Sequence, residues 1–209
     1  MKIMLIQQAE TDMAWEARYD AAGFEAAAAE ERLCGIAPTK ERRSNAAAWR
    51  VYTGTTRASR ETAALLFSLA EPPTETALLD DVLPRAFADT ARLRPLRLWL
   101  AMAAAQWAVG NSRQRESRRE TYSRLSRFVD TIEADGRDCV VVSRGLAMYA
   151  LKHVLRRRGY VLEGGDLRPR PLERVRASKK SLHCGGCAHN CLLSEAKCQT
   201  GKNKALGIR

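Results

Sequence analysis

One segment of the chain reads Asp138-Cys139-Val140-Val141-Val142-Ser143. Its middle is a continuous apolar run of mostly β-branched residues, which is typical of a strand covered on both faces in a parallel sheet. Lys2 to Ile6 is a second short apolar run and is followed at once by polar residues, as suits the end of a strand. Arg50 to Thr53 is a third expected strand.

Long stretches with helical character separate these strands. Strands that alternate with helices indicate an α/β domain with a mostly parallel sheet. Proline and glycine residues fall between the elements, as residues that interrupt helices and strands should. The expected helices span residues 24–33, 39–48, 59–69, 96–109, 117–134 and 146–158.

The composition is that of a globular protein and excludes disordered and collagen-like classes. The chain has 209 residues, with 35 Lys and Arg against 24 Asp and Glu, so its formal net charge is +11. Residues 168–209 carry +8 of that charge. Such a basic tail indicates nucleic acid as a partner, since Lys and Arg displace counterions from phosphates. Yet no aromatic residue follows Tyr160, so base stacking is unavailable in the tail.

Nothing in the sequence indicates export or a membrane partner. The four apolar residues Ile3 to Ile6 are far fewer than a signal peptide needs. The longest apolar run, residues 96–109, contains Arg97 and Gln106 and falls short of the roughly 18 residues that span a bilayer. We therefore expect a cytoplasmic protein, in which cysteines serve as thiols or metal ligands rather than in disulfides.

Three loops after the expected strands carry a family resemblance. Leu5-Ile6-Gln7-Gln8-Ala9-Glu10-Thr11-Asp12 resembles the Arg-His-Gly-Glu-Thr signature of the histidine phosphatase superfamily, the phosphoglycerate mutase-like proteins. Residues 52–63 look like that family's arginine-bearing loop, and Val140-Val141-Val142-Ser143-Arg144-Gly145 looks like its late strand ending in Ser-His-Gly. The resemblance implies a three-layer α/β/α domain over residues 1–163.

The resemblance also implies which residues of the family's site have changed. In the family, one histidine attacks the phosphoryl group, arginines and a second histidine hold its oxygens, and an acid protonates the leaving group. The matching positions form a degenerate pocket of Gln7, Gln8, Glu10, Arg57, Ala58, Asp81 and Arg144. Gln8 takes the place of the nucleophile, and Arg144 that of the second histidine. Because an amide cannot form a phosphoramidate, the covalent route is closed.

Three functions remain open at this point. The first is a catalytically inactive pseudophosphatase that binds a phosphorylated or anionic ligand through Arg144, Arg57 and Arg60, or binds a protein partner. The second is a divergent phosphatase or phosphomutase-like hydrolase, in which Asp81 or Glu10 acts as a base on water. The third is a metal- or Fe-S-dependent redox or nucleic-acid-associated module, in which the tail carries the function and the body is a scaffold.

Near the end of the chain, four cysteines follow the spacing C-x2-C-x3-C-x6-C. Two glycines let the first pair turn toward one ion, and two later thiolates can complete a tetrahedron, so we expect zinc. A 4Fe-4S cluster is the alternative, although ferredoxin-type spacing is only partly met. His183 and His189 are substitute ligands. We expect a basic linker over residues 164–180 and a metal-binding segment over 181–209, whose ligands are Cys184, Cys187, Cys191 and Cys198.

Two other features have simpler interpretations. Cys139 is expected to be a buried strand residue, and Cys34 to pack at the end of a helix. The stretch of residues 96–109 carries Trp99, Met102 and Trp107 among alanines. It lies where the resembled family inserts cap elements over the pocket, and we expect its large side chains to pack in a core.

Overall fold

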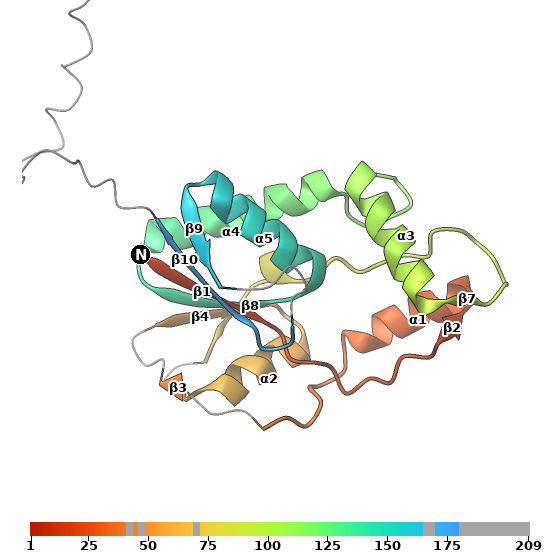
Figure 1. The fold of residues 1–209 in the computed structure, drawn as a ribbon, viewed down its shortest axis with the longest axis horizontal. Helices are drawn as coiled ribbons and strands as arrows, with labels where there is room; N and C mark the ends of the chain where they lie inside the picture. The colour runs from red at the N-terminus through yellow and green to blue at the C-terminus, as the bar shows by residue number, and fades with distance from the viewer. Residues whose placement is uncertain (41–43, 46–48, 69–71, 165–169, 180–209) are drawn as a thin grey trace, which may run out of the picture.

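The computed structural model describes residues 1–40, 44–45, 49–68, 72–164 and 170–179. Within these ranges, six strands form one sheet in the order β6-β4-β8-β1-β10-β9 (Figure 1). Four neighbouring strands run parallel: β6 (Thr74–Glu75), β4 (Arg50–Thr53), β8 (Cys139–Ser143) and β1 (Lys2–Gln7). β10 (Arg174–Lys179) is antiparallel to β1 and to the edge strand β9 (Tyr160–Glu163). The predicted α/β class with a mostly parallel sheet is confirmed.

Strand β8 lies inside this sheet and is buried along its whole length. It pairs in parallel with β1 on one side and with β4 on the other. Cys139 and Val141 belong to the hydrophobic core on one face, whereas Val140 and Val142 belong to the core on the opposite face. This is the two-sided burial that its continuous apolar sequence predicts.

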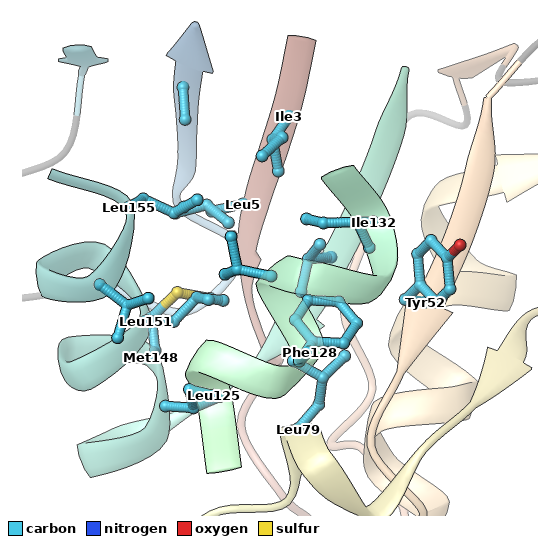
Figure 2. Close-up of a cluster of buried hydrophobic side chains, with 14 of the residues drawn as sticks. Ile3, Leu5, Tyr52, Leu79, Leu125, Phe128, Ile132, Met148, Leu151 and Leu155 are labelled. Carbon is cyan, nitrogen blue, oxygen red and sulfur yellow. The ribbon is translucent and has the colours of Figure 1, made fainter. Parts of the chain in front are cut away.

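Helices cover both faces of the sheet, so the domain has three layers. On one face, α4 (Arg118–Asp135) and α5 (Gly145–Arg157) pack their apolar stripes onto β1 and β8, with Phe128 and Leu151 in the shared cluster (Figure 2). On the other face lies α2 (Arg57–Leu66), through Ala63 and Leu66. The predicted three-layer α/β/α architecture is confirmed.

The ends of α4 follow from local sequence. The side-chain oxygen of Ser117 accepts from the backbone N–H of Glu120, and the Glu120 carboxylate accepts from the backbone N–H of Ser117 at 2.7 Å. This reciprocal pair satisfies two N–H groups that the first turn of a helix leaves unpaired. Gly136 ends the helix in a left-handed conformation, with φ of 68°. The predicted helix 117–134 is thus confirmed to within one residue at either end.

A small unit lies beyond the end of the sheet and is called here the cap unit. It consists of β2 (Arg18–Tyr19), α1 (Ala21–Glu31), β7 (Arg94–Pro95) and α3 (Leu96–Val109), which lie together in Figure 1. The rings of Phe24 and Trp99 stack at a centroid distance of 5.4 Å. Trp99 is fully buried, and Trp107 is 4% exposed. The expected core packing of these tryptophans is confirmed, whereas Met102 is 38% exposed.

Residues 39–48 do not form the predicted helix in their described part. Ser44–Asn45 is a short strand, β3, which pairs in parallel with β5 (Phe67–Ser68). The next predicted helix, 59–69, also ends early, at Leu66, because Phe67 takes up an extended conformation. A short 3-10 helix, η1 (Ala77–Leu79), follows β6.

The predicted basic linker over residues 164–180 is wrong for Arg174–Lys179, which form β10. This strand lies between β1 and β9 and places Val175 and Ala177 in the core under α5. Exposed arginines alternate with these buried residues. The two-residue period of a strand is therefore present, but the basic residues obscure it in the sequence. The four cysteines of the predicted metal site lie outside the described residues.

The described cysteines have the expected packing roles. Cys139 is buried, and desolvation raises the pKa of its thiol to about 12. Cys34 follows α1 and is partly buried, with its backbone N–H bonded to the carbonyl oxygen of Glu31. Separately, none of the helices in the described ranges has both the length and the hydropathy required to cross a membrane.

If β10 belongs to the core, a charge at Val175 should destabilise the domain. We expect Val175→Asp to lower the free energy of unfolding by about 3 kcal/mol, because it buries an unpaired carboxylate. Ser178→Asp, on the other face of the same strand, should change it by less than about 1 kcal/mol. Urea denaturation followed by circular dichroism measures both variants, and equal midpoints would show that β10 does not contribute to the core.

Candidate functional site

The loops that follow β1, β4 and β8 meet at one edge of the sheet. The backbone N–H of Gln8 donates to the carbonyl oxygen of Ser143 at 2.9 Å. The side-chain Oε1 of Gln8 accepts from the Ser59 hydroxyl, in the first turn of α2, at 2.7 Å. Carboxyl ends of parallel strands are where ligand sites of open α/β sheets lie. The three loops that resemble phosphatase motifs are therefore adjacent.

Gln8 is buried at this junction, with 4% of its surface exposed. The Thr56 hydroxyl lies 3.4 Å from its Oε1 and 2.9 Å from the Ser59 hydroxyl. These hydroxyls tie the Gln8 amide to the start of α2. An amide held in this way is a hydrogen-bonding group and neither a nucleophile nor a base.

Arg144 lies between β8 and α5 and is paired with two carboxylates. Its Nη2 donates to Glu31 Oε1, at the end of α1, at 2.8 Å. Its Nε lies 3.6 Å from Asp81 Oδ2. The side chain of Arg144 is 31% exposed and that of Glu31 is 15% exposed. The positive charge that could attract an anion is therefore already neutralised inside the protein.

Asp81 contacts the N-terminal end of α5. Its Oδ1 accepts from the backbone N–H groups of Val82, at 2.9 Å, and Ala147, at 3.1 Å. Gly145 has a left-handed φ of 53°, and a Cβ at this position would lie 2.0 Å from Asp81 Oδ2. A glycine is therefore required where the carboxylate approaches the backbone. Asp81 occupies the helix terminus that would otherwise favour a bound anion.

The neighbouring Asp80 holds a second arginine. Its Oδ2 accepts from Arg32 Nη2 at 3.0 Å and from the Thr55 hydroxyl at 2.6 Å. Glu31, Arg32 and Asp80 were not among the residues singled out from the sequence. Glu31 is 113 positions from Arg144, so no local pattern could indicate the contact. The one local feature that links Asp80 to the site is that it is adjacent in sequence to Asp81.

A cavity of about 560 Å³ lies between this strand edge and the cap unit. Gln8, Glu31, Arg32, Asp81 and Arg144 form part of its lining. Much of the remaining wall is apolar and comes largely from α3 and the segment before it, and it includes Trp15, Leu83, Pro84, Leu100, Ala104 and Trp107. The site combines a polar end, whose arginines are paired, with an apolar body.

The other predicted pocket residues lie elsewhere. Gln7 and Glu10 line a neighbouring cavity of about 490 Å³, which Gln8 and Arg144 also line. Gln7 Oε1 is buried and accepts no hydrogen bond from the described residues. Arg57 does not line the large cavity, because it is exposed and pairs with Glu61 at 2.6 Å. Ala58 is buried in the first turn of α2, where its carbonyl oxygen accepts from the Thr62 hydroxyl.

Arg60 lies outside the cavity, and the predicted metal ligands lie outside the described residues. Arg60 pairs with Glu75 at 3.2 Å and is not part of the cavity lining. In the described ranges, no cluster of three or more His, Cys, Asp or Glu side chains could hold a metal ion. The zinc or 4Fe-4S site at the four cysteines stays a prediction.

Comparison with known proteins gives few matches. No protein-family model and no curated protein matches the chain. A structure described as mycobacterial hydrolase 2 aligns with a TM-score of 0.45 and 14% identity, covering 74% of this chain and 71% of the other. A mycobacterial glucosyl-3-phosphoglycerate phosphatase complexed with VO3 aligns with a TM-score of 0.44 and 17% identity, covering 74% and 81%. At these values neither structure assigns a family or an activity to this chain.

The contact between Asp81 and Gly145 can be tested by a double-mutant cycle. We expect Gly145→Ala to lower the free energy of unfolding by about 2 kcal/mol or more, since the left-handed backbone costs an L-residue roughly 1–2 kcal/mol and the Cβ displaces Asp81. The penalty should shrink in an Asp81→Ala background, where the clash is absent. Urea denaturation measures the loss of unfolding free energy caused by Gly145→Ala in each background. Equal losses with and without the Asp81 side chain would show that its close approach to Gly145 does not contribute to the penalty.

The protonation of Asp81 should appear in the pH dependence of stability. Burial raises the pKa of Asp81, while Arg144 and the N–H groups of Ala147 and Val82 lower it in part. A raised pKa in the folded state means that the group's contribution is greatest below its unfolded pKa, about 3.9, and is lost as pH rises through the folded pKa. We therefore expect the stability of the wild type relative to Asp81→Asn to fall from pH 4 upward in urea titrations. A flat or rising difference would contradict this.

Proposed function

We propose that this chain is a pseudophosphatase, a binding protein of histidine-phosphatase type without phosphohydrolase chemistry. Its cavity holds a small ligand with an apolar body. The proposal is supported by the adjacency of the three motif-like loops after β1, β4 and β8. It is supported also by the buried Gln8 amide, which stands where the resembled family has its nucleophilic histidine.

The observation that carries the proposal is the pairing of Arg144 with Glu31 and Asp81. A phosphate dianion at this position would have to displace Glu31 and lie beside the Asp81 carboxyl, which costs like-charge repulsion. Arg32 is likewise paired with Asp80. The polar end of the cavity therefore suits a neutral or cationic hydrogen-bond donor better than the phosphorylated or anionic ligand expected from the sequence.

The side chains of the cap unit determine that the body of the ligand is apolar. Leu100, Ala104 and Trp107 of α3 face the cavity together with Trp15. Apolar walls with a few polar groups at one end are the usual construction of a small-molecule site. Burial of an apolar ligand surface against these side chains would supply the affinity, and the polar end would orient the ligand.

The cavity can be tested with a neutral, environment-sensitive fluorophore, N-phenyl-1-naphthylamine. We expect saturable binding with enhanced emission, and at least a tenfold loss of affinity for Ala104→Phe, because the ring would fill the cavity. Ala105→Phe is the matched control, since Ala105 is the next residue of α3, is exposed and does not line the cavity. It should bind as the wild type does.

The wild-type protein should not hydrolyse p-nitrophenyl phosphate faster than a Gln8→Ala variant does. Millimolar phosphate esters should not raise its melting temperature. Hydrolysis that depends on Asp81 would favour the divergent hydrolase instead. If phosphate esters raised the melting temperature of the wild type but not that of Arg144→Ala, the ligand would be anionic, as expected from the sequence. Equal probe binding by the two phenylalanine variants would reject the cavity as the binding site.

A further inference from the structure

The outer surface of α4 and α5 carries arginines that contact an aromatic ring. Arg118, at the start of α4, places its Cζ 5.3 Å from the centroid of the Tyr122 ring. Arg157, at the end of α5, places its Cζ 5.7 Å from the same centroid. Two guanidinium groups from different helices are thus brought to one tyrosine, which fixes their positions through cation–π attraction.

The aromatic surface continues along α5. The ring of His153 lies 6.1 Å from that of Tyr122 and 5.0 Å from that of Tyr149, centroid to centroid. Tyr149 is 49% exposed. Tyr122, His153 and Tyr149 therefore form a row of three rings with a cation-rich end and an exposed end. We call this row, with Arg118, Arg156 and Arg157, the cationic-aromatic face.

Within the described ranges, the cations of this face are not paired with carboxylates. Arg118, Arg156 and Arg157 are exposed, and none of them forms a salt bridge with an acidic group in the described part of the chain. Nearby acids are used elsewhere: Glu116 pairs with Arg124, and Asp130 pairs with Arg158. The face therefore keeps three positive charges available to an external anion.

The helix dipoles explain the positions of two of these arginines but not that of the third. Arg156 and Arg157 lie in the last turn of α5, where a cation is favoured by the helix dipole. Arg118 is the first residue of α4, where a cation is disfavoured for the same reason. Its position at a helix start, on the same tyrosine ring as Arg157, is thus electrostatically unfavourable in the free protein, and a bound polyanion would offset this cost.

His153 adds an aromatic surface without adding repulsion. Its pKa is lowered, first by burial and then by Arg156, Arg118 and Arg157. The imidazole is therefore neutral at neutral pH and serves as a ring between the two tyrosines. Arg156 follows His153 by three residues in α5, which places the two side chains on the same side of the helix.

We propose that the cationic-aromatic face binds single-stranded nucleic acid. Phosphates would contact Arg118, Arg156 and Arg157, and a base would stack on Tyr149. Single strands are favoured over duplexes because stacking on a side chain requires an unstacked base. The site shares Tyr149 with the cavity proposed above, but its arginines lie on the outer surface of α4 and α5. It also lies on the folded domain, not in the basic tail.

The test is fluorescence anisotropy of a fluorescein-labelled 20-nucleotide oligouridylate, titrated with the full chain over a series of salt concentrations. We expect Arg118→Glu/Arg157→Glu to weaken binding at least tenfold and to reduce the salt dependence, since phosphate contacts are lost. Arg92→Glu/Arg97→Glu is the matched control, because both arginines are exposed and lie at the cap unit. It makes the same change in net charge and should bind within about threefold of the wild type.

Stacking is tested separately by Tyr149→Ala. This variant should bind about tenfold more weakly with an unchanged salt dependence, and a duplex of equal length should bind more weakly than the single strand. Equal losses in the two arginine pairs would overturn the proposal and assign binding to the overall charge of the chain. Equal competition by a poly-glutamate peptide would overturn it in favour of an acidic protein partner. Circular dichroism melts confirm that each variant is folded.

Discussion

The approach of the Asp81 carboxylate to the start of α5 determines the character of the site. It requires a glycine at position 145, and it places a carboxyl at the helix terminus and beside Arg144. Glu31 holds the same arginine from the other side. The protein therefore supplies its own anionic groups to the arginine at this edge of the sheet, where Arg144 is paired with Glu31 and Asp81. These paired groups form the polar end of the cavity, and the rest of its wall is largely apolar.

The elements that could be predicted from sequence are those whose signals are local. β8 is a continuous apolar run with both faces covered, and α4 has a capping box and a glycine stop within its own sequence. β10 was missed because its buried Val175 and Ala177 alternate with arginines in a basic, proline-containing segment, where charge hid the period of two. β3 was missed because a two-residue strand is defined by its partner β5, not by its own residues.

In the site, too, residues with a local sequence signal could be predicted, and residues defined by distant contacts could not. Gln8, Asp81 and Arg144 were predicted because two of them follow strands and all three match motif positions, and the structure brings them to one cavity. Glu31 and Arg32 were not predicted. They reach the site from the end of α1 through contacts with residues that are far away in the sequence, which no local spacing indicates. Arg57 was placed in the pocket wrongly. As the first residue of α2, it lies on the exposed side, and the helix buries Ala58 instead.

The place of β10 in the sheet has a consequence for how the chain folds during synthesis. β1 pairs with β8 and with β10, so the first strand has both partners in the latter part of the chain. Pairings between such distant segments are slow, because the loop between them must close before any contact forms. Until β8 and β10 have been synthesised, β1 lacks both of its partners in the sheet, and unpaired apolar strands favour aggregation. The sheet can therefore be completed only after β10 has been synthesised.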